Sequence, residues 1–145
     1  MQMGPHSGQH QSQPPSQPQH QPQVTPASDE RLMAMLSHLS ILVSHGGIIV
    51  PILIWLLNKD KAPFAAYQAK QALFFHLAVI VLTWGIGLVT FLIAVVTFGI
   101  GLFFLFPLLA ALGLLPMIYG IVGAIQSYEG RDFRYWWIGD VVKPD

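Results

Sequence analysis

The stretch that decides the fold is residues 71–128, QALFFHLAVIVLTWGIGLVTFLIAVVTFGIGLFFLFPLLAALGLLPMIYGIVGAIQSY, which contains no Asp, Glu, Lys or Arg. It lies between Lys70 and Glu129 and is 129 − 70 − 1 = 58 residues long. A membrane-spanning helix needs about 20 apolar residues, each adding about 1.5 Å of length. The stretch therefore predicts two spans, over residues 72–97 and 102–127, joined by a tight turn at 98–101.

A second uncharged run covers residues 32–58, which is 58 − 32 + 1 = 27 residues, and predicts one further span over residues 36–57. Gly46, Gly47 and Pro51 mark positions where we expect this span to kink or break, because both residue types weaken a helix. The sequence thus predicts an all-α membrane protein with three transmembrane helices.

The overall composition supports a lipid environment. The chain is 53% hydrophobic and 10% charged, whereas soluble domains contain about 25% charged residues. Residues 1–28 are mostly Gln, Pro, Ser and His, a composition that cannot bury enough apolar surface to fold. We therefore expect a disordered N-terminal tail ahead of a membrane domain over residues 29–145. The net charge of zero gives no reason to expect nucleic-acid binding.

Two further segments have the composition of membrane interfaces. Residues 64–71 are expected to form an amphipathic approach along the headgroups, and residues 129–143 combine cations with aromatic rings. The residues expected to contact the interface are Lys59, Lys61, Lys70, Arg131, Arg134, Tyr135, Trp136 and Trp137. With three spans, these cations share one side and only Arg31 lies on the other. The positive-inside rule then predicts a plasma-membrane protein with its N-terminus outside and its C-terminus cytoplasmic.

Small and hydroxylated residues recur along each expected span at steps of three and four. Such faces are typical of close helix packing in lipid, where backbone approach and hydrogen bonds replace the hydrophobic effect. The residues expected to form a helix-packing or partner interface are Ser44, Gly47, His76, Thr83, Gly87, Thr90, Gly113, Gly120 and Ala124. The same pattern could line a polar groove or pore, but packing is the favoured interpretation.

The sequence contains little that could carry catalysis. His38, His45 and His76 fall within the apolar stretches, where an ionisable group is a functional hypothesis because its burial is costly. Since His38 and His76 are expected near opposite faces of the membrane, we predict hydrogen-bonded histidines and neither a cofactor nor a metal. Every carboxylate lies outside the spans, so no buried acid pair is available for proton transfer. We expect that the chain is not an enzyme.

Several short motifs resemble a widespread bacterial membrane family of unknown function. They are DERLMAMLSHLS at 29–40, IVP at 49–51, KDKAPF at 59–64, QAKQAL at 68–73 and GRDFRY at 130–135. That family is distantly similar to the twenty-kilodalton membrane subunit of the chloroplast inner-envelope (Tic) import machinery. The resemblance covers residues 29–143, with departures at Phe74, where the family usually has Asn, and at Trp136, where it has Pro. It implies membership of a membrane complex and names no catalytic residue.

These observations lead to one expected function and two alternatives. We expect a non-enzymatic accessory or interaction subunit of a membrane complex, in contact with the bilayer and with other membrane proteins or copies of itself, in Tic-like protein handling. The first alternative is a small channel or carrier subunit that oligomerises around the Thr and Gly stripe of the second span. The second alternative is a histidine-ligated redox subunit.

Overall fold

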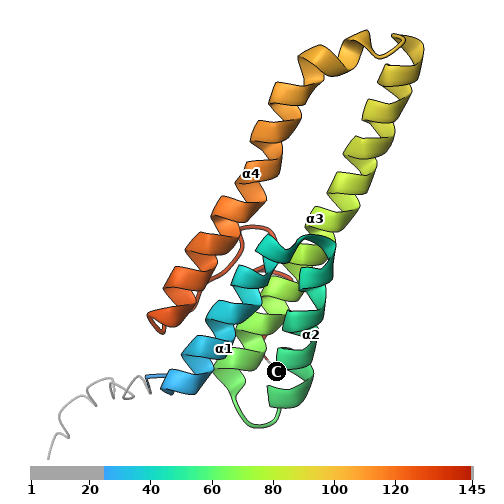
Figure 1. The fold of residues 1–145 in the computed structure, drawn as a ribbon. Coiled ribbons are helices and arrows are strands. Elements are labelled where there is room, and N and C mark those ends of the chain that lie inside the picture. Colours follow the sequence, from blue (N-terminus) through green and yellow to red (C-terminus); the bar gives the residue numbers. More distant parts are fainter. Residues whose placement is uncertain (1–24, 145) are drawn as a thin grey trace, which may run out of the picture.

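The computed structural model describes residues 25–144, except for the side chains of residues 44–46. The expected disordered tail of residues 1–28 therefore lies almost wholly outside the described residues. Within them the chain is all-α, as predicted. It consists of α1 (Ser28–Leu39), a 3-10 segment η1 (Ser40–Ile48), α2 (Ile49–Asn58), α3 (Pro63–Val96) and α4 (Ile100–Tyr128) (Figure 1).

Helices α3 and α4 are both long and apolar enough to cross a membrane, with 34 and 29 residues respectively. They contain the second and third expected spans almost completely. Pro63 stands in the first turn of α3, where its missing N–H is not needed. The turn between the helices has positive φ at Phe98 (50°) and Gly99 (83°), a conformation that lets the chain reverse within a few residues.

The first expected span is not a single helix. Helices α1 and α2 both pack against the near half of α3 and are joined by η1, so that residues 28–58 reverse direction and form a helical hairpin (Figure 1). Within η1 the chain folds back closely on itself, because a Cβ atom on Gly47 would collide with the carbonyl oxygen of Ser40. The glycines that were expected to kink this helix thus lie where the chain reverses direction, and the part of the chain that the structure describes has two candidate spans instead of three.

This reversal also changes the expected topology. The start of α1 lies beside the start of α3, since Glu30 Oε2 accepts a hydrogen bond from Phe64 N at 3.1 Å. It also lies beside the end of α4, since a Cβ atom on Gly130 would be 3.2 Å from Cδ of Arg31. The N- and C-terminal ends of the described chain therefore lie at the same end of the molecule. This arrangement is not the one expected, which had the N-terminus outside and the C-terminus cytoplasmic.

The molecule divides into a base and an arm. The base comprises residues 25–76 and 119–144, in which α1, α2, the near halves of α3 and α4 and the C-terminal strap (residues 129–143) pack together. The arm comprises residues 77–118, which are the far halves of α3 and α4 with their connecting turn (Figure 1). Every buried residue of α3 and α4 lies in the base, and none lies in the arm.

Candidate functional site at the base

A fully buried histidine stands at the centre of the base. His38 of α1 contacts side chains from α3 and from the C-terminal strap. Its Nε2 lies 3.1 Å from Oε1 of Gln68, and its Nδ1 lies 2.9 Å from the hydroxyl of Tyr135. A Cβ atom on Gly123 of α4 would be 3.1 Å from the same Nδ1, so only glycine leaves room for the ring at this position.

The hydrogen bonds around His38 have one consistent direction. Gln68 Nε2 donates to the carboxylate of Asp132 at 3.0 Å, and a carboxylate can only accept. The other end of the amide, Oε1, must then accept, and it receives bonds from His38 Nε2–H and from the hydroxyl of Ser127 at 3.3 Å. His38 Nδ1 consequently accepts from the Tyr135 hydroxyl. This chain of bonds requires His38 to be neutral.

The electrostatics of the site agree with that assignment. Burial lowers the pKa of His38 from 6.5 to about 4, and nearby His76 lowers it further, while the hydrogen bond that His38 donates to Gln68 acts in the opposite direction. Burial likewise raises the pKa of the Tyr135 hydroxyl well above its usual value of 10.0. Both groups are therefore uncharged at neutral pH, and the centre of the base carries no net charge of its own.

Tyr135 is also the centre of an aromatic cluster. Its ring stacks on Phe75 of α3, with centroids 3.9 Å apart and planes 9° apart. Tyr119 of α4 and Phe133 of the strap meet it edge-on at 5.1 and 4.9 Å, the arrangement that aromatic quadrupoles favour. Next to this cluster, the backbone N–H of Trp136 donates to the Tyr119 hydroxyl at 3.2 Å. These contacts hold the C-terminal strap against α3 and α4.

A second polar group ties the end of the strap to α3. Gln71 Nε2 donates to the Tyr67 hydroxyl at 3.0 Å and lies 3.4 Å from the carbonyl oxygen of Val142. On the next turn, His76 Nδ1 lies 2.6 Å from the carbonyl of Ala72, and its Nε2 lies 3.4 Å from Ser40 Oγ. The expectation that His38 and His76 lie near opposite faces of the membrane is therefore wrong, because the hairpin brings both into one core.

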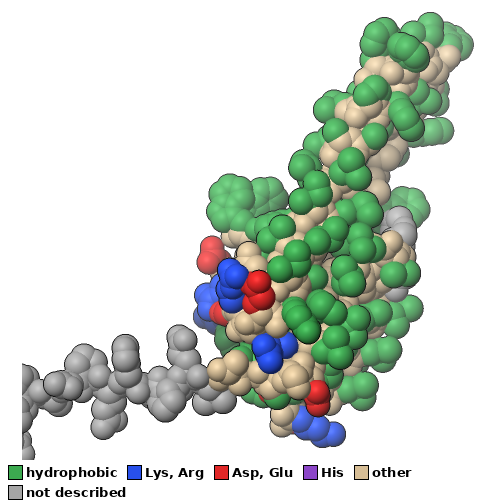
Figure 2. Space-filling model, turned by 60° about the vertical axis from the view of Figure 1, so that its left-hand side comes forward, with side chains coloured by type: hydrophobic (Ala, Val, Ile, Leu, Met, Phe, Trp, Pro, Cys, Tyr) green, Lys and Arg blue, Asp and Glu red, His purple; other side chains and the backbone are tan. Residues whose placement is uncertain are grey.

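In the view of Figure 2, charged side chains gather along one side of the base and at its lower end. Asp132 pairs with Arg134 at 3.0 Å, and Glu129 pairs with Arg131. Lys70 donates to the carbonyl oxygen of Lys143 at 3.2 Å. Because the two ion pairs are exposed to solvent, they contribute little to stability. Their main consequence is the contrast with the arm, which has no charged residue at all.

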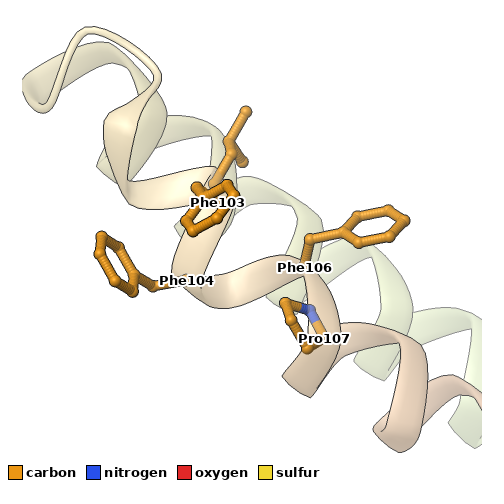
Figure 3. A pocket seen from close by; sticks show the side chains of 5 residues that line it. Phe103, Phe104, Phe106 and Pro107 are labelled. Atoms are coloured by element: carbon orange, nitrogen blue, oxygen red, sulfur yellow. The ribbon is translucent and has the colours of Figure 1, made fainter.

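The chemistry available at the base is limited. Among the described residues there is no cluster of three or more His, Cys, Asp or Glu side chains that could hold a metal ion. A hollow lies on the arm, where a shallow apolar depression is lined by Leu102, Phe103, Phe104, Phe106 and Pro107. Figure 3 shows Phe104 and Phe106 pointing away from the helix in different directions. The side chains that line the hollow therefore do not point toward a common position where a ligand could bind. The buried polar residues join four segments and fix the position of the strap.

The structure divides the residues expected at helix interfaces into two groups. Gly47, His76, Gly120 and Ala124 are buried in the base. Thr83, Gly87, Thr90 and Gly113 lie on the arm, where a Cβ atom on Gly87 or Gly113 would meet nothing within 4 Å. Thr83 bonds only to its own helix, through the carbonyl of Val79. The side chain of Ser44 lies outside the described residues. A partner interface at the arm residues stays a prediction.

The residues expected at the membrane interface differ in exposure. Lys59, Lys61, Arg131 and Arg134 are exposed, as are Trp136 and Trp137, and Lys70 is partly exposed. Tyr135 is different, because only 2% of its surface is exposed and it belongs to the core. Sequence reasoning also missed Gln68, Gln71 and Phe133. The spacing of Gln68 and Gln71, three apart, was the available signal, because it places both amides on one face of the helix.

Comparison with known proteins identifies a family. Residues 29–142 match the magnetosome magnetite crystal formation protein family, MamF/MmsF. The match covers the whole membrane domain, including the buried polar core and almost all of the strap. No curated protein and no solved structure matches the chain.

This match corrects the earlier family assignment and the function derived from it. The uncharacterised family with Tic-like relatives is not the family of this chain, and neither the accessory role in protein handling nor the channel alternative holds. The motifs behind that resemblance cover most of α1, the loop between α2 and α3, part of α3 and the start of the strap. They include His38, Gln68 and Tyr135 of the buried core, so they reflect how this domain packs, and packing alone does not assign a function.

Proposed function

We propose that this chain, which belongs to the magnetosome magnetite crystal formation protein family, acts in the magnetosome membrane and contributes there to the formation of magnetite crystals. The observation that carries the proposal is the family match over residues 29–142. Two long apolar helices support the membrane location. The proposal requires no catalytic step, and the expectation that the chain is not an enzyme stays a prediction.

The distribution of charge favours one orientation for this proposal. All seven Lys and Arg residues of the chain lie in the base, and the turn between α3 and α4 has none. Under the positive-inside rule the base faces the cytoplasm, with both ends of the membrane domain on that side. The turn at Phe98 and Gly99 then faces the interior of the magnetosome. Any influence on the crystal from the cytoplasmic side would act through the membrane or through other proteins.

The functional experiment removes the gene in cells that form magnetosomes and restores it on a plasmid. Electron microscopy measures the number, size and shape of the crystals. We expect altered crystals in the deletion strain and recovery with the intact chain, together with co-purification of the chain with magnetosome membranes. Crystals that are unchanged by the deletion would contradict the proposed function.

The orientation is tested with single cysteines, since the chain has none of its own. In sealed isolated magnetosomes, whose outer face is the cytoplasmic one, a membrane-impermeant thiol reagent should label Lys61→Cys and leave Phe98→Cys unlabelled until the membrane is opened. Labelling of Phe98→Cys in sealed magnetosomes, with Lys61→Cys protected, would reverse the proposed orientation.

A further inference from the structure

The cross-section of the molecule differs greatly between its two ends. The arm contains only the far halves of α3 and α4, whereas the base adds α1, η1, α2 and the C-terminal strap around the near halves (Figure 1). Across a membrane, one half of the protein therefore displaces much more lipid than the other. This asymmetry follows from the hairpin, because a single spanning helix in its place would have given both halves three helices.

Outside residues 44–46, whose side chains the structure does not describe, the outer surface of the hairpin carries large apolar side chains. Val43 at the tip is 66% exposed, and Leu53 and Leu57 on α2 are 51% and 68% exposed. The inner surface carries the buried Ser37 and His38. A continuous apolar surface of this kind is rare on proteins in water. Since it continues directly onto the exposed apolar surfaces of α3 and α4, lipid chains are the occupant that fits it (Figure 2).

The length of the hairpin limits how far it can enter the bilayer. Helix α1 has 12 residues and α2 has 10, which correspond to about 18 and 15 Å at the usual helical rise. The hydrocarbon core of a bilayer is about 30 Å thick, so a single leaflet contributes about 15 Å of it. Charged residues at the start of α1 and in the loop after α2, including Arg31 and Lys61, hold the open end of the hairpin at the headgroups. The hairpin can therefore enter one leaflet only. Because residues 77–96 of α3 alone correspond to about 30 Å, it enters that leaflet to the depth that tilting of the arm allows.

The strap adds to the same end of the molecule. Its Trp136 and Trp137 are 78% and 76% exposed, with ring centroids 5.8 Å apart. The neighbouring Tyr135 is held in the core, so the two indoles are presented outward from a fixed support. Tryptophan favours the boundary between headgroups and acyl chains. The two rings and the hairpin thus widen the protein at the level of one leaflet.

We infer that the chain is a membrane wedge that binds preferentially to bilayers that are convex on the side of its base. A convex leaflet has more area per headgroup and exposes gaps between lipids, which apolar side chains can fill. The hairpin and the two tryptophans place apolar surface in that leaflet, and the narrow arm occupies less of the opposite one. With the base toward the cytoplasm, the favoured curvature is that of a small closed compartment inside the cell.

The experiment uses the full chain reconstituted into vesicles of one lipid mixture, phosphatidylethanolamine with phosphatidylglycerol, prepared in a small and a large size. A mixed population is separated after reconstitution, and the protein-to-lipid ratio of each size is measured, together with the fraction of chains whose base faces outward. For base-outward chains we expect the ratio to be about twofold or more higher in the small vesicles. Equal ratios would overturn the inference.

Two matched variants locate the effect. Leu53→Ser with Leu57→Ser alters the hairpin, and Leu92→Ser with Val96→Ser alters the arm at positions of similar exposure, 54% and 78%. The hairpin variant should lose the preference for small vesicles, whereas the arm variant should keep it. A hairpin variant that keeps the full preference would contradict the inference.

A depth measurement tests the inference independently of vesicle size. A nitroxide attached to Val43→Cys should be accessible to oxygen and protected from a water-soluble paramagnetic reagent, as expected within the acyl chains of one leaflet. The same label on Phe98→Cys should report the opposite surface. A label at residue 43 that is open to the aqueous reagent would mean that the hairpin lies outside the bilayer, and the wedge would not exist.

Discussion

The two halves of helix α3 differ both in composition and in surroundings. The near half, in the base, contains Gln68, Gln71 and His76, each 3% exposed or less. The far half, in the arm, has no buried residue, and Val96 is 78% exposed. The comparison shows that polar and small residues, rather than apolar ones, indicate where this protein packs against itself. In lipid, apolar side chains gain little from leaving one hydrocarbon environment for another.

The largest change in stability is expected when the central histidine is replaced. His38→Leu would leave Gln68 and Tyr135 buried without their partner, and we expect a loss of about 4 kcal/mol in the free energy of unfolding. The measurement is denaturant unfolding in detergent, followed by circular dichroism. Thr83→Val in the arm is the matched control and should change stability by less than about 0.5 kcal/mol. Equal effects of the two substitutions would mean that the base is not the stable part of the molecule.

Acidification should weaken the base next most strongly. The pKa of His38 is about 4 in the folded chain and 6.5 when unfolded, so the unfolded state binds the proton first as pH falls. The stabilisation is complete above pH 6.5 and is lost between pH 6.5 and pH 4, by up to about 3 kcal/mol. His38→Gln cannot titrate and should have a flatter profile of stability against pH. A profile unchanged by that substitution would assign the pH dependence to other groups.

A smaller effect is expected from filling the space at the glycines of α4. A Cβ atom on Gly120 would be 2.6 Å from Cγ2 of Ile41 and 3.3 Å from the carbonyl oxygen of His38, whereas one on Gly113 would meet nothing within 4 Å. Gly120→Leu should therefore destabilise the chain by about 2 kcal/mol through overpacking. Gly113→Leu should not destabilise it through contacts within the chain. Thermal unfolding of both variants in the same detergent makes the comparison.

The smallest effect concerns the edge of the polar core. Asp132→Ala removes the acceptor for Gln68 Nε2 and should lower stability by about 1 kcal/mol. Asp60→Ala, in the exposed loop after α2, should change it by less than about 0.5 kcal/mol. Limited proteolysis of the C-terminal strap gives a second readout, because Asp132 holds the strap to α3. A strap that is cleaved equally in both variants would place the anchor elsewhere.

Much of the fold followed from local sequence features. The uncharged stretch of residues 71–128 predicts two long helices, and the turn residues between them lie where they were expected. The break in the first apolar run was also indicated, at Gly46 and Gly47. Its size was not, because a kink and a complete reversal of the chain require the same residue types. The difference depends on whether α2 can pack beside α1 and α3, which is a contact between distant segments.

The candidate site was less predictable for the same reason. Tyr135 was assigned to the interface together with Trp136 and Trp137, because all three occur in one aromatic run. Only the packing of the strap against Phe75 and Tyr119 separates the buried ring from the two exposed ones. Likewise, the functional inference from short motifs was wrong, and the match over the whole membrane domain replaced it.

By itself, the sequence determined that the chain is a membrane protein, that it is helical, and that its cations lie near the ends of the apolar stretches. These properties depend on hydrophobicity and charge, which are local and add along the chain. The tertiary structure decided that two helices can span, that both ends of the domain lie together, and that His38 is enclosed by Gln68 and Tyr135. Such properties arise from residues 30 to 97 positions apart meeting in one core, and no local pattern encodes which of them will meet.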